Sequence, residues 1–109
     1  MSETPAHRRA KKKAAGPGGK TEAPLPGGQR LDAITKGGGR ATEVERSGSA
    51  AELEAAAERL KKSDAWQKVL QVPQKDMNAA AAALLKAGIG GTVKNMGGTK
   101  SQAVRTPRK

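Results

Sequence analysis

Aromatic side chains and sulfur ligands are nearly absent from this chain of 109 residues. It contains no Cys, Phe or Tyr, one Trp and one His. Without Cys the chain can form neither disulfides nor thiolate metal sites, and a single His does not favour a His-based zinc site. Its core must be built from Leu, Ile, Val, Met and many Ala side chains, each of which buries little apolar area. We therefore expect a thin and modestly stable core.

Long apolar runs are absent as well. No run of apolar residues is long enough to cross a bilayer, and the charged N-terminus lacks the apolar segment of a secretory signal. The length allows one domain. Together with the absence of Cys, these features favour a cytoplasmic protein without a membrane partner. A thin core also leaves apolar edges exposed, and a homodimer would cover them.

Positive charge dominates what is present. Lys and Arg number 21 against 10 Asp and Glu, which gives a net charge of +11. Charge of this sign and size attracts polyanions, so nucleic acid is the expected partner. The alternative is that the basic ends only confer solubility. The candidate phosphate-binding residues are Arg8, Arg9, Lys11, Lys12, Lys13, Lys20 and Arg30.

The distribution of charge and glycine divides the chain into three parts. Residues 1–19 form a basic arm, in which a short helix over 6–15 would end at the following glycines. Because no apolar stripe would hold this helix to a core, we expect the arm to be flexible until a polyanion neutralises it. Residues 20–95 form the ordered domain, and residues 96–109 form a polar, basic tail.

The ordered part begins with three expected strands. Glycine-rich turns at 26–28 and 36–39 separate them and predict an antiparallel β-meander. The order β-β-β-α-β-α-β along the domain predicts an α/β (α+β) fold, in which two helices cover a small mixed sheet.

The clearest helix signal follows the meander. Ser49-Ala50-Ala51-Glu52 matches a capping box, and apolar residues then recur at i, i+3, i+4 and i+7 over 53–60. This pattern predicts a helix that runs to about Ser63. The later expected elements are a strand over 68–72, a helix over about 74–87 closed by Gly88, and a strand over 92–95.

Carboxylates stand on all three strands of the expected meander, although Asp and Glu are depleted in strands. Glu43 and Glu45 are two apart and share a face. Asp32 shares that face only if the paired residue numbers add up to an odd value, which a four-residue loop over 36–39 or 37–40 gives; a three- or five-residue loop would put Asp32 on the opposite face. Carboxylates at such short distances repel one another unless a cation neutralises them. Their oxygen atoms are the ligands that Mg²⁺ or Mn²⁺ prefers. The predicted metal ligands are Asp32, Glu43 and Glu45, with Glu22 as a further acidic group.

These strands resemble a known enzyme family. Thr21-Glu22, Arg30-Leu31-Asp32-Ala33-Ile34 and Ala41-Thr42-Glu43-Val44-Glu45, followed by a helix and a strand, resemble the restriction-endonuclease-like PD-(D/E)xK nuclease superfamily over residues 20–72. In that family a helix usually carries an early Glu, a central strand the Asp and the next strand Glu-x-Lys. The resemblance implies an Mg²⁺-dependent endonuclease, with DNA as the preferred guess for its substrate.

The match to the motif is incomplete at its third position. Glu45 stands where the family most often has Lys, and Lys61, Lys62 or Lys68 could supply the missing cation. The implied catalytic residues are Glu22, Asp32, Glu43, Glu45 and Lys68.

Other interpretations stay open. Glu43 and Glu45 could belong to a solvated strand face, paired with Arg30 or Arg46. Trp66 is expected in the core or against a helix, rather than stacked on a base. The rival functions are a non-enzymatic DNA- or RNA-binding protein and a protein-interaction module whose acidic strand face meets a basic partner.

Overall fold

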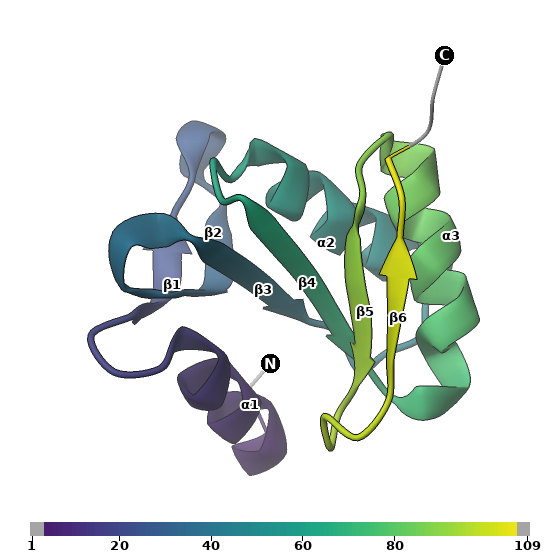
Figure 1. The fold of residues 1–109 in the computed structure, drawn as a ribbon, viewed down its shortest axis with the longest axis horizontal. Coiled ribbons are helices and arrows are strands. Elements are labelled where there is room, and N and C mark those ends of the chain that lie inside the picture. Colours follow the sequence, from purple (N-terminus) through teal and green to yellow (C-terminus); the bar gives the residue numbers. More distant parts are fainter. Residues whose placement is uncertain (1–3, 107–109) are drawn as a thin grey trace.

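A single mixed sheet of six strands organises the molecule, with three α-helices packed on it (Figure 1). The computed structural model describes residues 4–106. The predicted mixed α/β fold is confirmed, and a helix and a strand are added at its two ends. No helix in this described part is long and apolar enough to span a bilayer. The elements are α1 (Pro5–Ala15), β1 (Lys20–Pro24), β2 (Arg30–Ile34), β3 (Arg40–Val44), α2 (Ala50–Lys62), β4 (Gln67–Val72), α3 (Met77–Ala87), β5 (Gly91–Asn95) and β6 (Ser101–Val104).

The strands lie in chain order across the sheet, from β1 at one edge to β6 at the other. The pairs β1–β2 and β2–β3 are antiparallel, which confirms the predicted meander. The helices α2 and α3 then act as crossovers, because β4 runs parallel to β3 and β5 runs parallel to β4. β6 returns antiparallel to β5.

The register of the β2–β3 hairpin decides which carboxylates meet. Ala33 lies opposite Thr42, and the Thr35 N–H donates to the Arg40 carbonyl at 3.0 Å. The loop therefore has four residues, 36–39, and paired numbers add up to an odd value. Asp32 is accordingly level with Glu43, which is the parity that the acidic-face prediction requires.

Helix α2 begins and ends where the sequence pattern predicts. The Ser49 hydroxyl accepts from the Glu52 N–H at 3.5 Å, and the helix ends one residue before Ser63. Helix α3 ends at Gly88, which adopts the left-handed conformation (φ 78°) and donates its N–H to the Leu85 carbonyl. Both helices bury their apolar residues against one face of the sheet.

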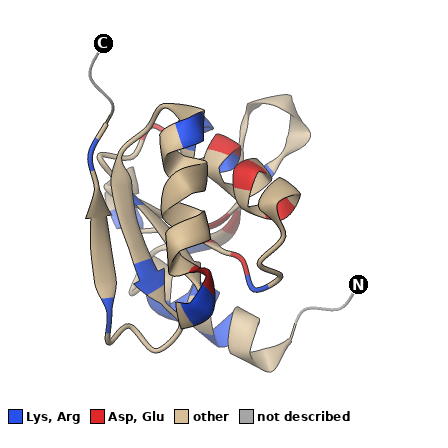
Figure 2. Cartoon of the chain, turned by 90° about the vertical axis from the view of Figure 1, so that its right-hand side faces the viewer, with Lys and Arg blue, Asp and Glu red and all other residues tan. Residues whose placement is uncertain are grey.

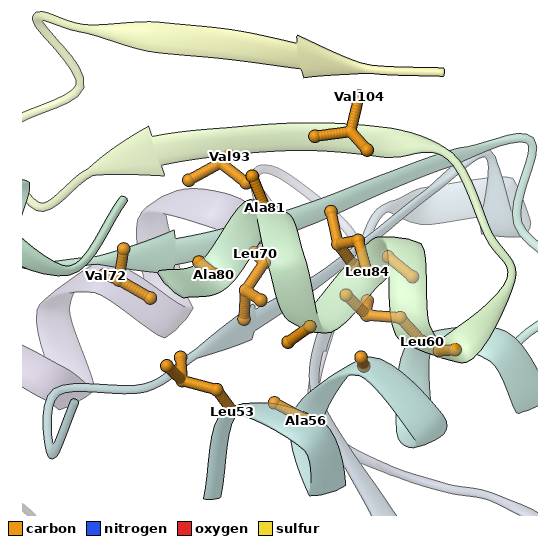
Figure 3. Close-up of a cluster of buried hydrophobic side chains, with 14 of the residues drawn as sticks. Leu53, Ala56, Leu60, Leu70, Val72, Ala80, Ala81, Leu84, Val93 and Val104 are labelled. Atoms are coloured by element: carbon orange, nitrogen blue, oxygen red, sulfur yellow. The ribbon is translucent and has the colours of Figure 1, made fainter. Parts of the chain in front are cut away.

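That face holds the hydrophobic core (Figure 3). Strand β4 shows how the sheet divides its side chains: Leu70 and Val72 point into the core, while Val69 and Gln71 point to the opposite face. The core is thin, as expected, because alanines fill many of its positions. Its members include Leu53, Ala56, Ala57 and Leu60 from α2, Ala80, Ala81 and Leu84 from α3, and Leu70, Val72, Val93 and Val104 from the sheet.

Helix α1 packs on the opposite face, mainly against β1, β2 and β3 (Figure 1). Thr4 caps it by accepting from the His7 N–H at 3.1 Å, and Ala15 and Lys11 are buried. Gly19 runs so close beneath the helix end that a Cβ there would lie 2.0 Å from the Ala15 carbonyl oxygen. The expectation that nothing would hold the helix of the arm to the core is therefore wrong, whereas the flexibility predicted for residues 1–19 stays a prediction and residues 1–3 lie outside the described residues.

The C-terminal segment is also part of the sheet. The Asn95 side chain accepts from the N–H groups of Thr99 and Lys100 at 2.9 and 3.2 Å, which closes a polar turn. The chain then returns as β6 along β5. The segment predicted as a polar, basic tail over residues 96–109 thus contains a strand that the sequence did not indicate, Ser101–Val104, because this turn returns the chain to the sheet. Residues 107–109 lie outside the described residues.

Candidate functional site

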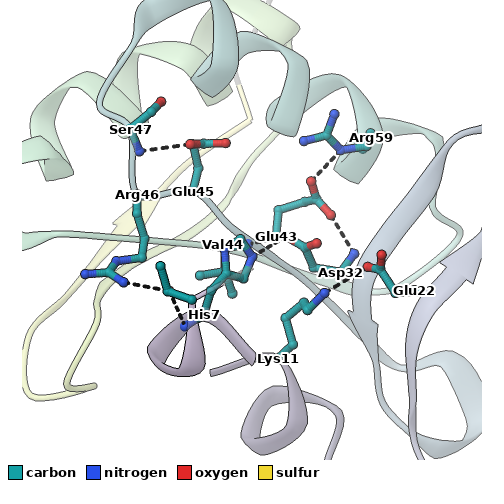
Figure 4. A network of polar contacts seen from close by, with 11 residues as sticks. His7, Lys11, Glu22, Asp32, Glu43, Val44, Glu45, Arg46, Ser47 and Arg59 are labelled. Atoms are coloured by element: carbon teal, nitrogen blue, oxygen red, sulfur yellow. Dashed lines mark hydrogen bonds and ion pairs between the residues drawn. The ribbon is translucent and has the colours of Figure 1, made fainter. Parts of the chain in front are cut away.

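Three predicted site carboxylates meet across the first three strands (Figure 4). Glu22 lies between the pairs Thr21–Ala33 and Ala23–Leu31, which places it level with Asp32. Asp32 is in turn level with Glu43 on β3. The predicted converging set was Asp32, Glu43 and Glu45; Asp32 and Glu43 lie level, whereas Glu45 follows the end of β3 and accepts from the Ser47 N–H. What surrounds them decides what they can do.

Glu43 is the most enclosed of the three, with 0% of its surface exposed. One carboxylate oxygen accepts from Nε of Arg59 on α2, and the other accepts from the Asp32 N–H at 2.7 Å. Burial, followed by repulsion from Asp32, raises the pKa of the Glu43 carboxyl to about 7, although Arg59 opposes the rise. Both oxygens of Glu43 are thus occupied by protein donors.

Asp32 is bonded in the reciprocal way. Its Oδ2 accepts from the Val44 N–H at 2.8 Å and lies 3.7 Å from Nε2 of His7 on α1. Burial raises the pKa of the Asp32 carboxyl, while the Val44 N–H and the positive groups of His7 and Lys11 act against the rise. The side chains of Asp32 and Glu43 thus bond to the partner strand's backbone beyond the last ladder pair.

Glu22 receives a lysine from α1. The Lys11 ammonium lies 3.1 Å from Oε2 of Glu22, and the Lys11 side chain is only 5% exposed. Glu22 has a φ of 54°, which is unusual for a residue with a side chain. At the start of the helix, Arg46 donates to the Thr4 hydroxyl at 2.9 Å. Polar contacts therefore fix α1 to the sheet, in place of the apolar stripe that the helix lacks.

These carboxylates are engaged by protein donors and do not form a cluster of three metal ligands in the described part of the chain. In residues 4–106 no three His, Cys, Asp or Glu side chains are grouped so that they could hold an ion. The predicted third ligand, Glu45, accepts from the Ser47 N–H at 2.9 Å. The ammonium of Lys68, the implied catalytic lysine, donates to the Ala65 carbonyl at 2.7 Å. Each oxygen of Glu43 already accepts from one protein donor, so a metal ion would have to share these oxygens with Arg59 and the Asp32 N–H.

A basic groove lies beside α1 on the uncovered half of the sheet. We use this name for a hollow of about 550 Å³ between α1 and strands β3–β5. Its charged lining consists of Arg9 and Lys13 from α1, Arg40 from β3 and Lys94 from β5. None of the described residues that line the hollow is acidic. In Figure 2 the acidic segments gather instead on α2, which covers the other face.

A second hollow of about 700 Å³ continues the basic groove toward the β4–β6 end. It shares Arg40, Val69 and Lys94 with the groove, and its described lining residues likewise include no acidic residue. The Arg40 Nε donates to the Gln67 side-chain oxygen at 3.0 Å, which positions the guanidinium at the junction of the two hollows. Trp66 stands on the rim of this second hollow.

The predicted phosphate-binding residues fall into three groups: residues that line the basic groove, one buried residue, and exposed residues outside both hollows. Arg9 and Lys13 line the basic groove, whereas Lys11 is buried and faces Glu22. Each of the others is exposed and lines neither hollow: Arg8, Lys12, Lys20 and Arg30.

The predicted phosphate-binding residues do not include Arg40 and Lys94, which line both hollows, and Trp66 was expected in the core or against a helix. The alternation of buried Val93 with exposed-face Lys94 was available as a signal, because neighbouring residues of a strand face opposite sides. Trp66 is 95% exposed, so its expected core position is wrong. Ala65 occupies the core position next to it instead, with 3% of its surface exposed.

Comparisons with protein-family models, curated proteins and solved structures gave no match for this chain.

Proposed function

We propose that this protein binds nucleic acid through the basic groove. The observation that carries the proposal is the convergence of Arg9, Lys13, Arg40 and Lys94 on one open face whose described lining residues include no acidic residue. Cations that share a concave surface attract a phosphate backbone, and counterion release then supplies sequence-independent affinity.

The interior charges explain why the groove is so strongly positive. Asp32 and Glu43 have N–H or cationic partners inside the fold, and the partly exposed Glu22 pairs with Lys11; none of the three lines the basic groove. The same contacts hold α1 in place and thereby position Arg9 and Lys13 opposite the sheet. A pre-organised set of cations loses less conformational freedom when it binds a phosphate chain.

The interaction-module alternative is less well supported. It requires an acidic strand face that is open to a basic partner, but Glu43 is fully buried and bonded to Arg59. The open face of the sheet is positive. Location in the cytoplasm and a homodimeric state stay predictions of the sequence.

A charge-reversal experiment tests the proposal. Arg40→Glu with Lys94→Glu is compared with Lys61→Glu and Lys75→Glu, which change the net charge equally but alter residues outside both hollows. Anisotropy titrations with labelled DNA and RNA, single- and double-stranded, measure the affinity at several salt concentrations. We expect the groove pair to weaken binding by about 100-fold and to lower the salt slope by about 2. Equal losses in the two pairs would show that net charge alone attracts the polyanion.

Metal-dependent cleavage is the second candidate function. The order helix, three strands, helix, strand and the level placement of Asp32 and Glu43 support this candidate, whereas Glu22 lies on β1 and not on the helix that usually carries the early Glu in the PD-(D/E)xK superfamily. Incubation of plasmid DNA and of RNA with the protein, in Mg²⁺ or in EDTA, measures this directly. Cleavage in Mg²⁺ that Asp32→Ala abolishes, with binding retained, would support it. Binding without cleavage in either condition would rule it out under those conditions.

A further inference from the structure

Trp66 is exposed in a chain that has few large apolar side chains to spare. It is the only aromatic residue, and 95% of its surface is open although the core is built largely from alanine. An indole of this kind costs solvation free energy unless a partner covers it. Its position on the rim of the second hollow, beside Arg40 and Lys94, limits what that partner can be.

We infer that Trp66 stacks on an unpaired base, so that the groove prefers nucleic acid with a single-stranded segment. This inference rests on the proposed nucleic-acid binding and specifies its substrate class. Single-strand binders combine a positive path for the phosphates with aromatic side chains on which bases stack. Here the basic groove supplies the path and Trp66 supplies the stacking surface.

The hollow beside Trp66 offers room and polar groups for a base. Its volume of about 700 Å³ lies within the range of small-molecule sites. The loop 88–91 contributes three glycines to its wall, and Gly90 and Gly91 have no space for a side chain. Hydroxyl and amide groups that can bond to the edges of a base come from Gln67, Thr92, Ser101 and Thr106.

The two hollows meet in a way that suits a single strand. Arg40 and Lys94 line both, so phosphates lying along the basic groove would pass these two cations before the chain reaches Trp66. A blunt duplex keeps its bases stacked on one another and presents only its backbone. It can use the cations of the groove but not the indole.

The absence of other aromatic residues makes the experiment direct. Intrinsic fluorescence of this chain comes from Trp66 alone, so its quenching reports contact at this side chain. The protein is titrated with a single-stranded 15-mer and with a blunt duplex hairpin of equal phosphate number. Anisotropy of labelled copies of the same two molecules measures binding separately. We expect strong quenching by the single strand and little by the bound duplex.

Two variants complete the test. Trp66→Ala should weaken single-strand binding by about 10-fold and leave duplex binding unchanged, whereas Trp66→Phe should retain most of the affinity. Because the side chain is exposed, circular dichroism should show both variants folded. Equal quenching by both nucleic acids, or a Trp66→Ala variant with unchanged single-strand affinity, would overturn this inference alone. No anisotropy change with either nucleic acid would overturn nucleic-acid binding itself and this inference with it.

Discussion

The two faces of the sheet solve the same packing problem with different chemistry. On one face α2 and α3 exclude water with Leu53, Leu84 and Leu70 among many alanines. On the other, α1 is held by Lys11, which pairs with Glu22, and by the Asp32–His7 contact. A chain with few large apolar residues has concentrated them on one side and uses charge to attach the helix on the other.

This difference has a consequence for binding. An apolar interface is non-directional and closes wherever area can be buried, whereas ion pairs fix a helix at particular points. Helix α1 packs mainly against β1, β2 and β3, and the hollow between α1 and strands β3–β5 stays open as the basic groove. The covered face therefore carries the stability, while the partly covered face is free to carry a ligand.

Truncation of the apolar face should give the largest effect on stability. Leu84→Ala removes a fully buried side chain from a thin core and should lower the free energy of unfolding by about 2–5 kcal/mol. Leu85→Ala on the same helix is the matched control, since Leu85 is 48% exposed. Urea denaturation measures both. Similar losses in the two variants would mean that α3 does not pack in the way described.

The buried carboxyl of Glu43 should make the free energy of unfolding depend on pH. Because the pKa of Glu43 is about 7 in the fold and 4.5 is its ordinary value, the folded state binds this proton more tightly than the unfolded chain does. That contribution to stability is fully present below pH 4.5 and is lost as the pH rises through 7. The Glu43→Gln variant has no titrating group at this position, so it lacks this pH-dependent contribution to stability.

The stability advantage of the native protein over this variant should therefore shrink by about 3 kcal/mol between pH 4 and pH 8. Urea denaturation of both proteins across this range measures the difference, in which most other titrating groups cancel. Glu58→Gln, at an exposed position of α2, controls for removal of one acidic charge. Parallel curves for the native protein and Glu43→Gln would contradict the buried carboxylate.

The attachment of α1 should depend on its buried lysine. Lys11→Met keeps the aliphatic stem but loses the contact to Glu22, and it should cost about 1–2 kcal/mol of stability. Hydrogen exchange of the α1 amides should accelerate, and nucleic-acid binding should weaken because Arg9 and Lys13 lose their fixed place. Lys12→Met, at an exposed position of the same helix, should change neither quantity. Unchanged exchange in Lys11→Met would show that other contacts hold the helix.

Local signals predicted the elements whose folding is decided locally. The capping box at Ser49, the left-handed Gly88 and the four-residue loop 36–39 each have a conformation set by the residues themselves. The level placement of Asp32 and Glu43 followed only for a four-residue loop, and the observed register shows that this condition is met.

The missed features depend on contacts between distant residues. The docking of α1 follows from Lys11 and His7 meeting carboxylates on strands that must first form, so no periodicity within residues 5–15 indicates it. The acidic row was predicted as a group, but its partner Arg59 lies on α2 and could not be identified from spacing. Trp66 was wrongly expected in the core because composition indicates how many apolar residues a chain has, but not which of them are buried.

The smallest expected effect is a difference in the salt dependence of binding between variants of two basic residues on α1, Arg9 and Lys12. Arg9 lines the basic groove and Lys12 does not, although both are exposed and lie within one turn of each other. Arg9→Ala should reduce the slope of log affinity against log salt by about 1, and Lys12→Ala should leave it nearly unchanged. Anisotropy titrations of a single-stranded 15-mer between low and moderate salt measure both slopes. A direct phosphate contact distinguishes these two neighbouring charges, whereas long-range attraction does not. Equal slopes in the two variants would therefore mean that the phosphates follow the whole positive surface of α1 and not the groove.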